Sequence, residues 1–173
     1  MLPKGTFVLG GAASGKSQWA EAHVASAGQP MIYLATGRTE DDETTARVEI
    51  HQARRDNQWT TIEEPLDLAA PLASLRPDTP VLIDCATMWL SNQMMRDADL
   101  TQETTKLIAA LNSCQAPWVI VSNEVGHGIV PDNRLARQFR EAQGRLNIAL
   151  AAAADLAVMV VAGLPQILKD TRA

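Results

Sequence analysis

The stretch from Gly10 to Ser17, "GGAASGKS", fits the pattern G-x-x-x-x-G-K-[ST] and directly follows the apolar run "TFVLG". This pattern binds phosphate when it follows a strand and opens a helix, because its glycines let backbone N–H groups curl around phosphate oxygens. The alternative is a chance glycine turn, which the Gly-Lys-Ser ending and the preceding strand argue against. The predicted nucleotide-binding residues are Gly10, Gly11, Ala12, Ala13, Ser14, Gly15, Lys16 and Ser17.

Two residues of this loop and one later carboxylate carry the expected chemistry. Lys16 is predicted to reach the β- and γ-phosphates and to act in catalysis, and the Ser17 hydroxyl to help hold Mg²⁺. The run "VLIDC" ends an apolar strand with Asp84, which is the Walker-B position that orients the metal. A carboxylate that only caps the following turn is the alternative for Asp84. The metal candidates are therefore Ser17 and Asp84.

Short apolar runs alternate with longer helical patterns along the chain. The runs are typical of strands buried on both faces, and strand–helix alternation indicates a parallel sheet with right-handed crossovers. We expect an α/β fold, a three-layer P-loop NTPase-type domain with a mostly parallel sheet, formed by residues 1–173 as one domain. The predicted strands are 6–10, 31–36, 80–85, 118–123 and 156–163, and the predicted helices are 14–27, 41–55, 66–75, 102–113 and 133–154.

Composition excludes several classes of protein. A formal net charge of −5 argues against nucleic-acid binding. Cys85 and Cys114 have no metal or redox spacing and are expected to be reduced thiols. No apolar run approaches the roughly 20 residues that a membrane span needs, and the first residues do not form a signal peptide. We therefore expect a cytoplasmic enzyme or binding protein.

The run "RVEIHQARR" places a histidine among arginines. Arg47, His51 and Arg55 recur at four-residue spacing, so on a helix they share one face. One interpretation is a solvated helix face. The other is a nucleophile among phosphate-binding cations, since neighbouring positive charge lowers the pKa of an imidazole and keeps it unprotonated.

Six blocks in order give the chain a resemblance that covers nearly its whole length. They are "GGAASGKS", "YLATG", "DDETTARVEIHQARR", "WTTIEEP", "LIDCATMWLSN" and "SNEVGHGIVPDNRLARQFREAQGRLN". The chain resembles the bifunctional adenosylcobinamide kinase/adenosylcobinamide-phosphate guanylyltransferases of cobalamin biosynthesis. The resemblance implies a RecA-like sheet, a homotrimer and two reactions. ATP or GTP phosphorylates adenosylcobinamide, and GMP from GTP is then transferred to adenosylcobinamide phosphate through a guanylyl-histidine.

The resemblance also implies roles for individual residues. His51 matches the histidine that carries GMP, and Glu63 matches a position that contacts guanosine. Asn123, Glu124 and Arg137 are expected to shape the nucleotide or acceptor pocket, whereas His23 and His127 are not expected to be catalytic. The other implied nucleotide-binding residues are Leu34, Ala35, Thr36, Gln52, Ala53, Arg54 and Arg55.

The sequence shows one departure from the family pattern, and it leaves four alternative functions open. The family commonly has an arginine where this chain has Ala13, so a phosphate contact from that side chain is missing. The chain could retain only the kinase or only the transferase step, or it could be another P-loop small-molecule kinase. A nucleotide-switched regulatory module without turnover is a further alternative, and the "EVGHGIVP" block argues against it.

Overall fold

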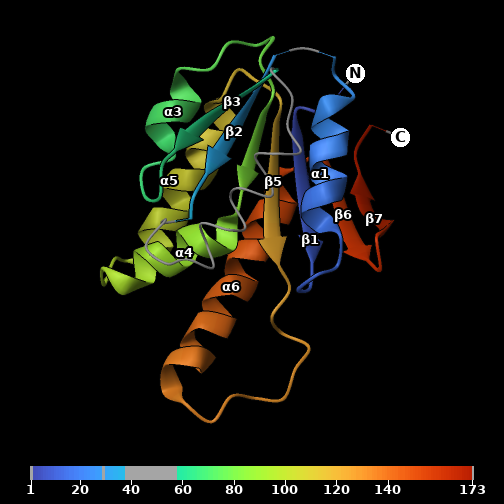
Figure 1. Cartoon of the computed structure of the whole chain (residues 1–173). Helices are drawn as coiled ribbons and strands as arrows, with labels where there is room; N and C mark the ends of the chain where they lie inside the picture. The colour runs from blue at the N-terminus through green and yellow to red at the C-terminus, as the bar shows by residue number, and fades with distance from the viewer. Residues whose placement is uncertain (1, 29, 38–57, 173) are drawn as a thin grey trace.

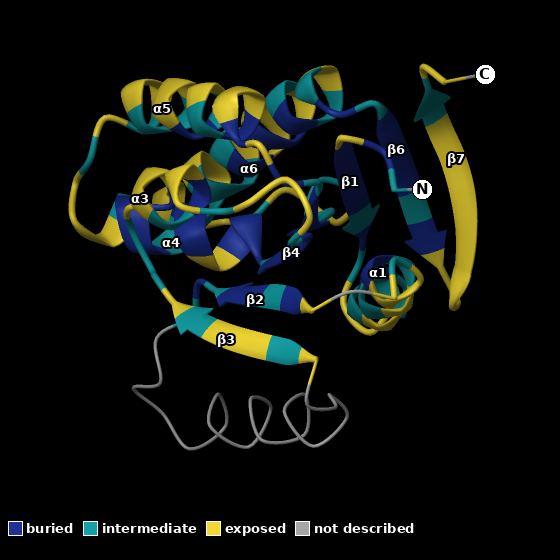
Figure 2. Cartoon of the chain, turned by 90° about the horizontal axis from the view of Figure 1, so that it is seen from above, coloured by how far each residue is buried: buried dark blue, intermediate teal, exposed yellow. Residues whose placement is uncertain are grey.

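A seven-stranded sheet runs through the molecule, with helices on both of its faces (Figures 1 and 2). The computed structural model describes residues 2–28, 30–37 and 58–172. The strand order is β3-β2-β4-β5-β1-β6-β7, and only the β6–β7 pair is antiparallel. The strands are β1 (Gly5–Gly10), β2 (Met31–Ala35), β3 (Trp59–Glu63), β4 (Val81–Asp84), β5 (Trp118–Asn123), β6 (Leu156–Val161) and β7 (Leu164–Asp170).

The helices divide between the two faces of the sheet (Figure 2). On one face lies α1 (Lys16–Ala25), which packs Ala20 and Val24 against the strands. The other face carries α3 (Ala69–Ala73), α4 (Ala86–Met95), α5 (Leu100–Ser113) and α6 (Arg134–Ala153). This arrangement confirms the expected three-layer α/β fold with a mostly parallel, RecA-like sheet.

Two hydrophobic clusters fill the spaces between the layers. Beneath α1 the cluster is built from aliphatic strand residues such as Val8, Val121 and Val158. The larger cluster on the opposite face adds Trp89 and Trp118, which are both almost fully buried. Successive strand residues point to opposite faces, so each central strand contributes to both clusters and reads as a continuous apolar run.

The predicted strands are confirmed except at the C-terminal edge of the sheet. The run 156–163 was expected to be one strand, but β6 ends at Val161 and a tight turn at Ala162 and Gly163 leads into β7. Both turn residues have positive φ, 52° and 77°, as a two-residue hairpin requires. The strand β7 was missed because it forms the outer edge of the sheet and is mostly exposed.

Other elements also differ from the prediction. The strand β3 was missed because it lies at the other edge and exposes Thr60 and Thr61. Helix α4 was missed as well. The predicted helix 66–75 is shorter, as α3, and the first helix begins at Lys16 because Gly15 has left-handed backbone angles. The predicted helix 41–55 lies outside the described residues. In the described parts of the chain, no helix is long and apolar enough to cross a membrane.

Candidate nucleotide site

The loop between β1 and α1 has a backbone path that depends on its glycines. Gly15 has a φ of 90°, and a Cβ there would lie 3.0 Å from the Cα of Gly163. A Cβ on Gly10 would lie 2.7 Å from the carbonyl oxygen of Val160, closer than real side chains come. The β6–β7 turn also donates a hydrogen bond from Gly163 N to Ser14 O, at 2.8 Å. Because the β6–β7 turn lies so close to the loop, Gly10 and Gly15 cannot be replaced by residues with side chains. The loop backbone can then form a phosphate cradle.

Lys16 opens α1 and lies folded over this loop. Its Nζ donates to the carbonyl oxygen of Gly11 at 3.0 Å. Burial lowers the pKa of Lys16, and the nearby Cys85 and Asp84 oppose that shift. The ammonium group is therefore partly desolvated and close to the end of β4. A desolvated cation at a helix N-terminus interacts strongly with an anion such as phosphate.

The end of β4 places a carboxylate beside the phosphate loop. Tyr33 in β2 donates from its hydroxyl to Asp84 Oδ2 at 3.2 Å. Thr36 accepts from Cys85 N at 2.8 Å and donates to Cys85 O at 2.7 Å, which fixes the backbone just after the carboxylate. Burial raises the pKa of the Cys85 thiol to about 11, so the thiol is neutral at physiological pH.

The oxygen donors at this point suit magnesium. Mg²⁺ is held by carboxylate and hydroxyl oxygens and keeps several waters. Asp84 supplies a carboxylate at the end of β4, and Ser17 supplies a hydroxyl in the first turn of α1. Lys16, adjacent to Ser17, is close enough to Asp84 for their charges to interact. This donor set fits a magnesium ion bound together with nucleotide phosphates.

The end of β5 completes the edge of the site next to the loop. Gly10 and Asn123 are register partners, and Glu124 N donates to Gly10 O at 3.1 Å. On the other side, Asn123 N donates to the Thr87 hydroxyl of α4 at 2.9 Å. The loop, the carboxylate and this strand end therefore lie at the carboxyl edge of three adjacent strands, where parallel α/β sheets bind ligands.

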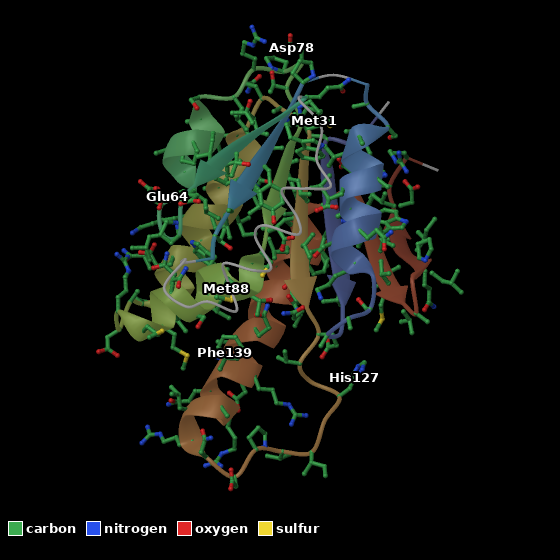
Figure 3. All side chains as sticks on the ribbon, viewed as in Figure 1. Met31, Glu64, Asp78, Met88, His127 and Phe139 are labelled. Atoms are coloured by element: carbon green, nitrogen blue, oxygen red, sulfur yellow. The ribbon has the colours of Figure 1, made fainter. Side chains whose placement is uncertain are left out.

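The segment after β5 extends away from the sheet toward the N-terminus of α6 (Figure 1). Arg140 donates to the carbonyls of Gly126 and Ile129, and Arg137 donates to Pro131 O and Asp132 O at 2.9 and 2.7 Å. These arginines therefore support the loop backbone. His127 is exposed on this loop, and Figure 3 shows it at the outer side of the segment.

The other predicted residues of the described chain lie along the same edge. Leu34 and Ala35 end β2, Thr36 directly follows this strand, and Glu63 ends β3. Ala35 is the register partner of both Glu63 and Asp84, so these strand ends are neighbours. His51, Gln52, Ala53, Arg54 and Arg55 lie outside the described residues.

Three contributors to the site were not predicted from the sequence. Tyr33 bonds to the Asp84 carboxylate, Thr87 accepts a hydrogen bond from the end of β5, and Gly163 contacts the loop between β1 and α1. Tyr33 and Thr87 lie within the blocks "YLATG" and "LIDCATMWLSN", but neither block indicates these contacts. The dipeptide Ala162–Gly163 does carry a turn signal, because glycine is favoured where φ is positive.

The loop, its lysine and the carboxylate on the next strand but one form the arrangement of a P-loop NTPase-type domain. The family described as "Cobinamide kinase / cobinamide phosphate guanyltransferase" matches residues 6–168. The chain belongs to this family, whose description names a kinase and a guanyltransferase that act on cobinamide.

Named relatives agree with this assignment. The chain is 40% identical to the "Bifunctional adenosylcobalamin biosynthesis protein CobU" of Escherichia coli (strain K12), over 91% of this chain and 96% of that protein. It is 40% identical to the "Bifunctional adenosylcobalamin biosynthesis protein CobP" of Pseudomonas aeruginosa, over 94% and 96% of the two chains.

A solved structure supports the fold alone. The flagellar accessory protein FlaH from Methanocaldococcus jannaschii superimposes with a TM-score of 0.55 at 10% identity. The match covers 99% of this chain and 81% of that one.

Proposed function

We propose that this chain catalyses both reactions named in the family description, with adenosylcobinamide and then its phosphate as substrates. The observation that carries the proposal is the cradle between β1 and α1, with Lys16 above it and Asp84 on the next strand but one. Family membership supplies the substrate class. The proposal treats residues 1–173 as one functional domain.

In the kinase step, a hydroxyl of adenosylcobinamide attacks the γ-phosphorus of ATP or GTP. The new O–P bond forms as the bond to the β–γ bridging oxygen breaks, and the hydroxyl proton is released. Backbone N–H groups of the loop and Lys16 stabilise the negative charge of the phosphates. Ser17 and Asp84 would hold Mg²⁺, which neutralises the phosphate charge when it is bound.

In the transferase step, His51 is the proposed nucleophile. A neutral imidazole nitrogen attacks the α-phosphorus of GTP, pyrophosphate leaves, and the phosphate of adenosylcobinamide phosphate then displaces the histidine and takes GMP. Splitting the transfer in this way is nucleophilic catalysis. Arg54 and Arg55 would keep the imidazole neutral and stabilise the phosphate charge, with Gln52 and Ala53 beside them.

Guanine selectivity is proposed for the ends of β2 and β3. A carboxylate can accept hydrogen bonds from the N1–H and N2–H₂ groups of guanine, which adenine cannot match. Glu63 is exposed and so can reach a ligand, and its register partner Ala35 lies with Leu34 and Thr36 at the edge of the site.

The setting of the reactions is also part of the proposal. We place the enzyme in the cytoplasm, where nucleoside triphosphates are available, acting as a homotrimer with no nucleic-acid partner. The net charge of −5 supports the last point, because nucleic-acid binding needs a basic surface.

A labelling experiment tests the transferase step directly. Wild-type protein is incubated with GTP that carries radioactive phosphorus at the α-position, and label on the protein is tested for stability. A phosphoramidate is labile to acid and stable to alkali. We expect such label on wild type and none on His51→Ala. Absence of label from wild type, or undiminished label on the variant, would contradict a guanylyl-histidine.

The alternatives give different results in the same assay series. A chain that retains only the kinase step converts adenosylcobinamide to its phosphate and takes up no label. A regulatory module binds nucleotide without consuming it when cobinamide is added.

A further inference from the structure

The carboxyl end of β5 carries a polar side chain to which the proposed reactions assign no step. Asn123 is the last residue of this strand, and β5 lies between β4, which ends at Asp84, and β1, which ends at Gly10. The residue is therefore placed between the proposed metal carboxylate and the first glycine of the phosphate loop.

Strand alternation shows toward which face Asn123 projects. Val121 packs in the cluster beneath α1, whereas Ser122 bonds to α6 on the opposite face. Asn123, two residues after Val121, therefore projects to the α1 face. The same argument applies to Asp84, because Leu82 also packs beneath α1. Both side chains thus lie on the face where Lys16 begins α1.

The backbone of Asn123 is held from both neighbouring helices. Its N–H donates to Thr87 in α4 at 2.9 Å, and its carbonyl accepts from Asn147 Nδ2 in α6 at 3.1 Å. Asn147 is itself fixed, because its Oδ1 accepts from Ser122 Oγ at 2.6 Å and from Gln143 Nε2 at 3.0 Å. Ser122, Gln143 and Asn147 are all buried. The position of Asn123 is therefore tightly specified.

The side-chain oxygen of Asn123 contrasts with this well-bonded backbone. Oδ1 is buried, and it accepts no hydrogen bond from the residues that the structure describes. A buried carbonyl oxygen left unpaired costs about 1–3 kcal/mol. An ionised phosphate oxygen has no proton to donate, so it cannot form a hydrogen bond with Oδ1. An O–H group can.

We propose that Asn123 Oδ1 accepts a hydrogen bond from an O–H group bound at the terminal-phosphate end of the nucleotide, and that Asn147 is its positioning residue. The donor is either the alcohol that receives the phosphoryl group or a water bound to magnesium. The inference rests on the proposed kinase step, and it gives that step a residue that places the acceptor or the metal.

The test uses three variants of the full chain. Asn123→Leu removes the acceptor with little change of volume. Asn147→Asp keeps the acceptor for Ser122 and Gln143 but removes the donor to the carbonyl of Asn123. Gln93→Leu is the matched control, because Gln93 is also a buried amide and bonds to Leu66 O at 2.9 Å, in the region of α3 and α4.

Three quantities are measured on each variant: thermal stability, nucleotide affinity with and without Mg²⁺, and kcat and KM for adenosylcobinamide phosphorylation. If the donor is a magnesium-bound water, Asn123→Leu weakens nucleotide affinity about 10-fold only when Mg²⁺ is present. If the donor is the alcohol, nucleotide affinity is unchanged and kcat/KM for adenosylcobinamide falls about 10-fold. Asn147→Asp shows the same pattern with a smaller change.

Two results overturn the inference. One is Asn123→Leu with wild-type kinase parameters and wild-type affinity for the magnesium nucleotide. The other is an equal loss in Gln93→Leu, which would assign the effect to stability. If the wild-type protein does not phosphorylate adenosylcobinamide, the proposed function is contradicted instead. The role of Asn123 is then tested only by the nucleotide affinity of Asn123→Leu with and without Mg²⁺.

Discussion

Lys16 combines two properties at the level of a single side chain: it is partly desolvated, and its ammonium rests on a backbone carbonyl of the loop that it serves. Hydrogen bonds from a charged group contribute about 1.5–3 kcal/mol. When a nucleotide binds, the Lys16 ammonium can therefore exchange its neutral carbonyl partner for an anionic phosphate oxygen.

Replacing Lys16 by alanine should weaken nucleotide binding by about 10-fold to 100-fold, as the loss of such a bond implies. Kinase turnover should fall below detection. Lys106→Ala, on the exposed surface of α5, is the control and should retain both properties. Unchanged phosphorylation by Lys16→Ala would show that the phosphates bind elsewhere.

The same lysine predicts a dependence of nucleotide affinity on pH. Burial lowers the pKa of Lys16 below the ordinary value of 10.5, and a bound triphosphate raises it again because anions favour the ammonium form. The complex therefore holds this proton more tightly than the protein alone does. Affinity should fall as pH rises through the lowered pKa, and calorimetry in alkaline buffers should detect proton uptake on binding. A flat affinity over that range would contradict the assignment.

Among the secondary-structure elements, the hairpin of β6 and β7 supports the phosphate loop. Its turn brings Gly163 within hydrogen-bond distance of Ser14 and against Gly15. Gly163→Ala adds a side chain at a φ of 77°, which costs about 1–2 kcal/mol. We expect a loss of stability together with weaker nucleotide binding, measured by thermal unfolding and titration.

Gly28→Ala is the matched control for this turn. Gly28 also has positive φ, 64°, and an added Cβ would meet no atom within 4 Å, but Gly28 follows α1 at the end remote from the loop. The stability of Gly28→Ala should fall by about as much as that of Gly163→Ala, and its nucleotide affinity should equal that of the wild type. Equal affinity losses in both variants would show that the hairpin has no specific influence on the loop.

The long helix α6 ends against a lysine from the edge strand. Lys169 Nζ donates to the carbonyls of Ala151, Ala152 and Ala154, the last turn of the helix and its cap. These carbonyls have no partners within the helix, and a cation there also interacts favourably with the helix dipole. Lys169→Met should lower the free energy of unfolding by about 1–3 kcal/mol in denaturant titrations. A loss below the error of the measurement would refute the capping role.

At the level of the whole molecule, the proposed trimer is open to measurement. Apolar side chains are exposed on the β6–β7 hairpin, among them Leu164 and Ile167. Exposed apolar patches on an edge strand are typical of protein–protein contacts. Sedimentation equilibrium should give three times the mass of the 18.7-kDa chain. A monomer at micromolar concentration would contradict this prediction.

The fold was predictable where the sequence pattern reflects burial on both faces. Central strands such as β4 and β5 are continuous apolar runs, so they could be identified as strands and placed along the chain from the sequence. The edge strands β3 and β7 could not be derived, because a half-exposed strand carries polar residues and resembles a loop. Helix α4 was missed for another reason: it follows β4 directly, with no intervening turn signal.

The site was predictable to the extent that it lies in one stretch of sequence. The phosphate loop has a motif, whereas Tyr33, Thr87 and Gly163 reach the site only through the topology of the sheet. Contacts between segments that are distant in the sequence leave no local pattern, so these three contacts cannot be predicted from the sequence. The histidine expected to carry GMP lies outside the described residues and stays a prediction.

The position of β1 in the sheet has a consequence for synthesis of the chain on the ribosome. This strand is made first, but Gly5 pairs with Trp118 and Thr6 with Leu156, so it has no strand partner until most of the chain has emerged. Its apolar side chains stay uncovered through most of translation, and the phosphate loop gains its Gly163 support only near the end. Contacts this distant in sequence form slowly, and unpaired apolar strands aggregate. Nascent chains truncated before β5 should therefore depend on chaperones and bind no nucleotide.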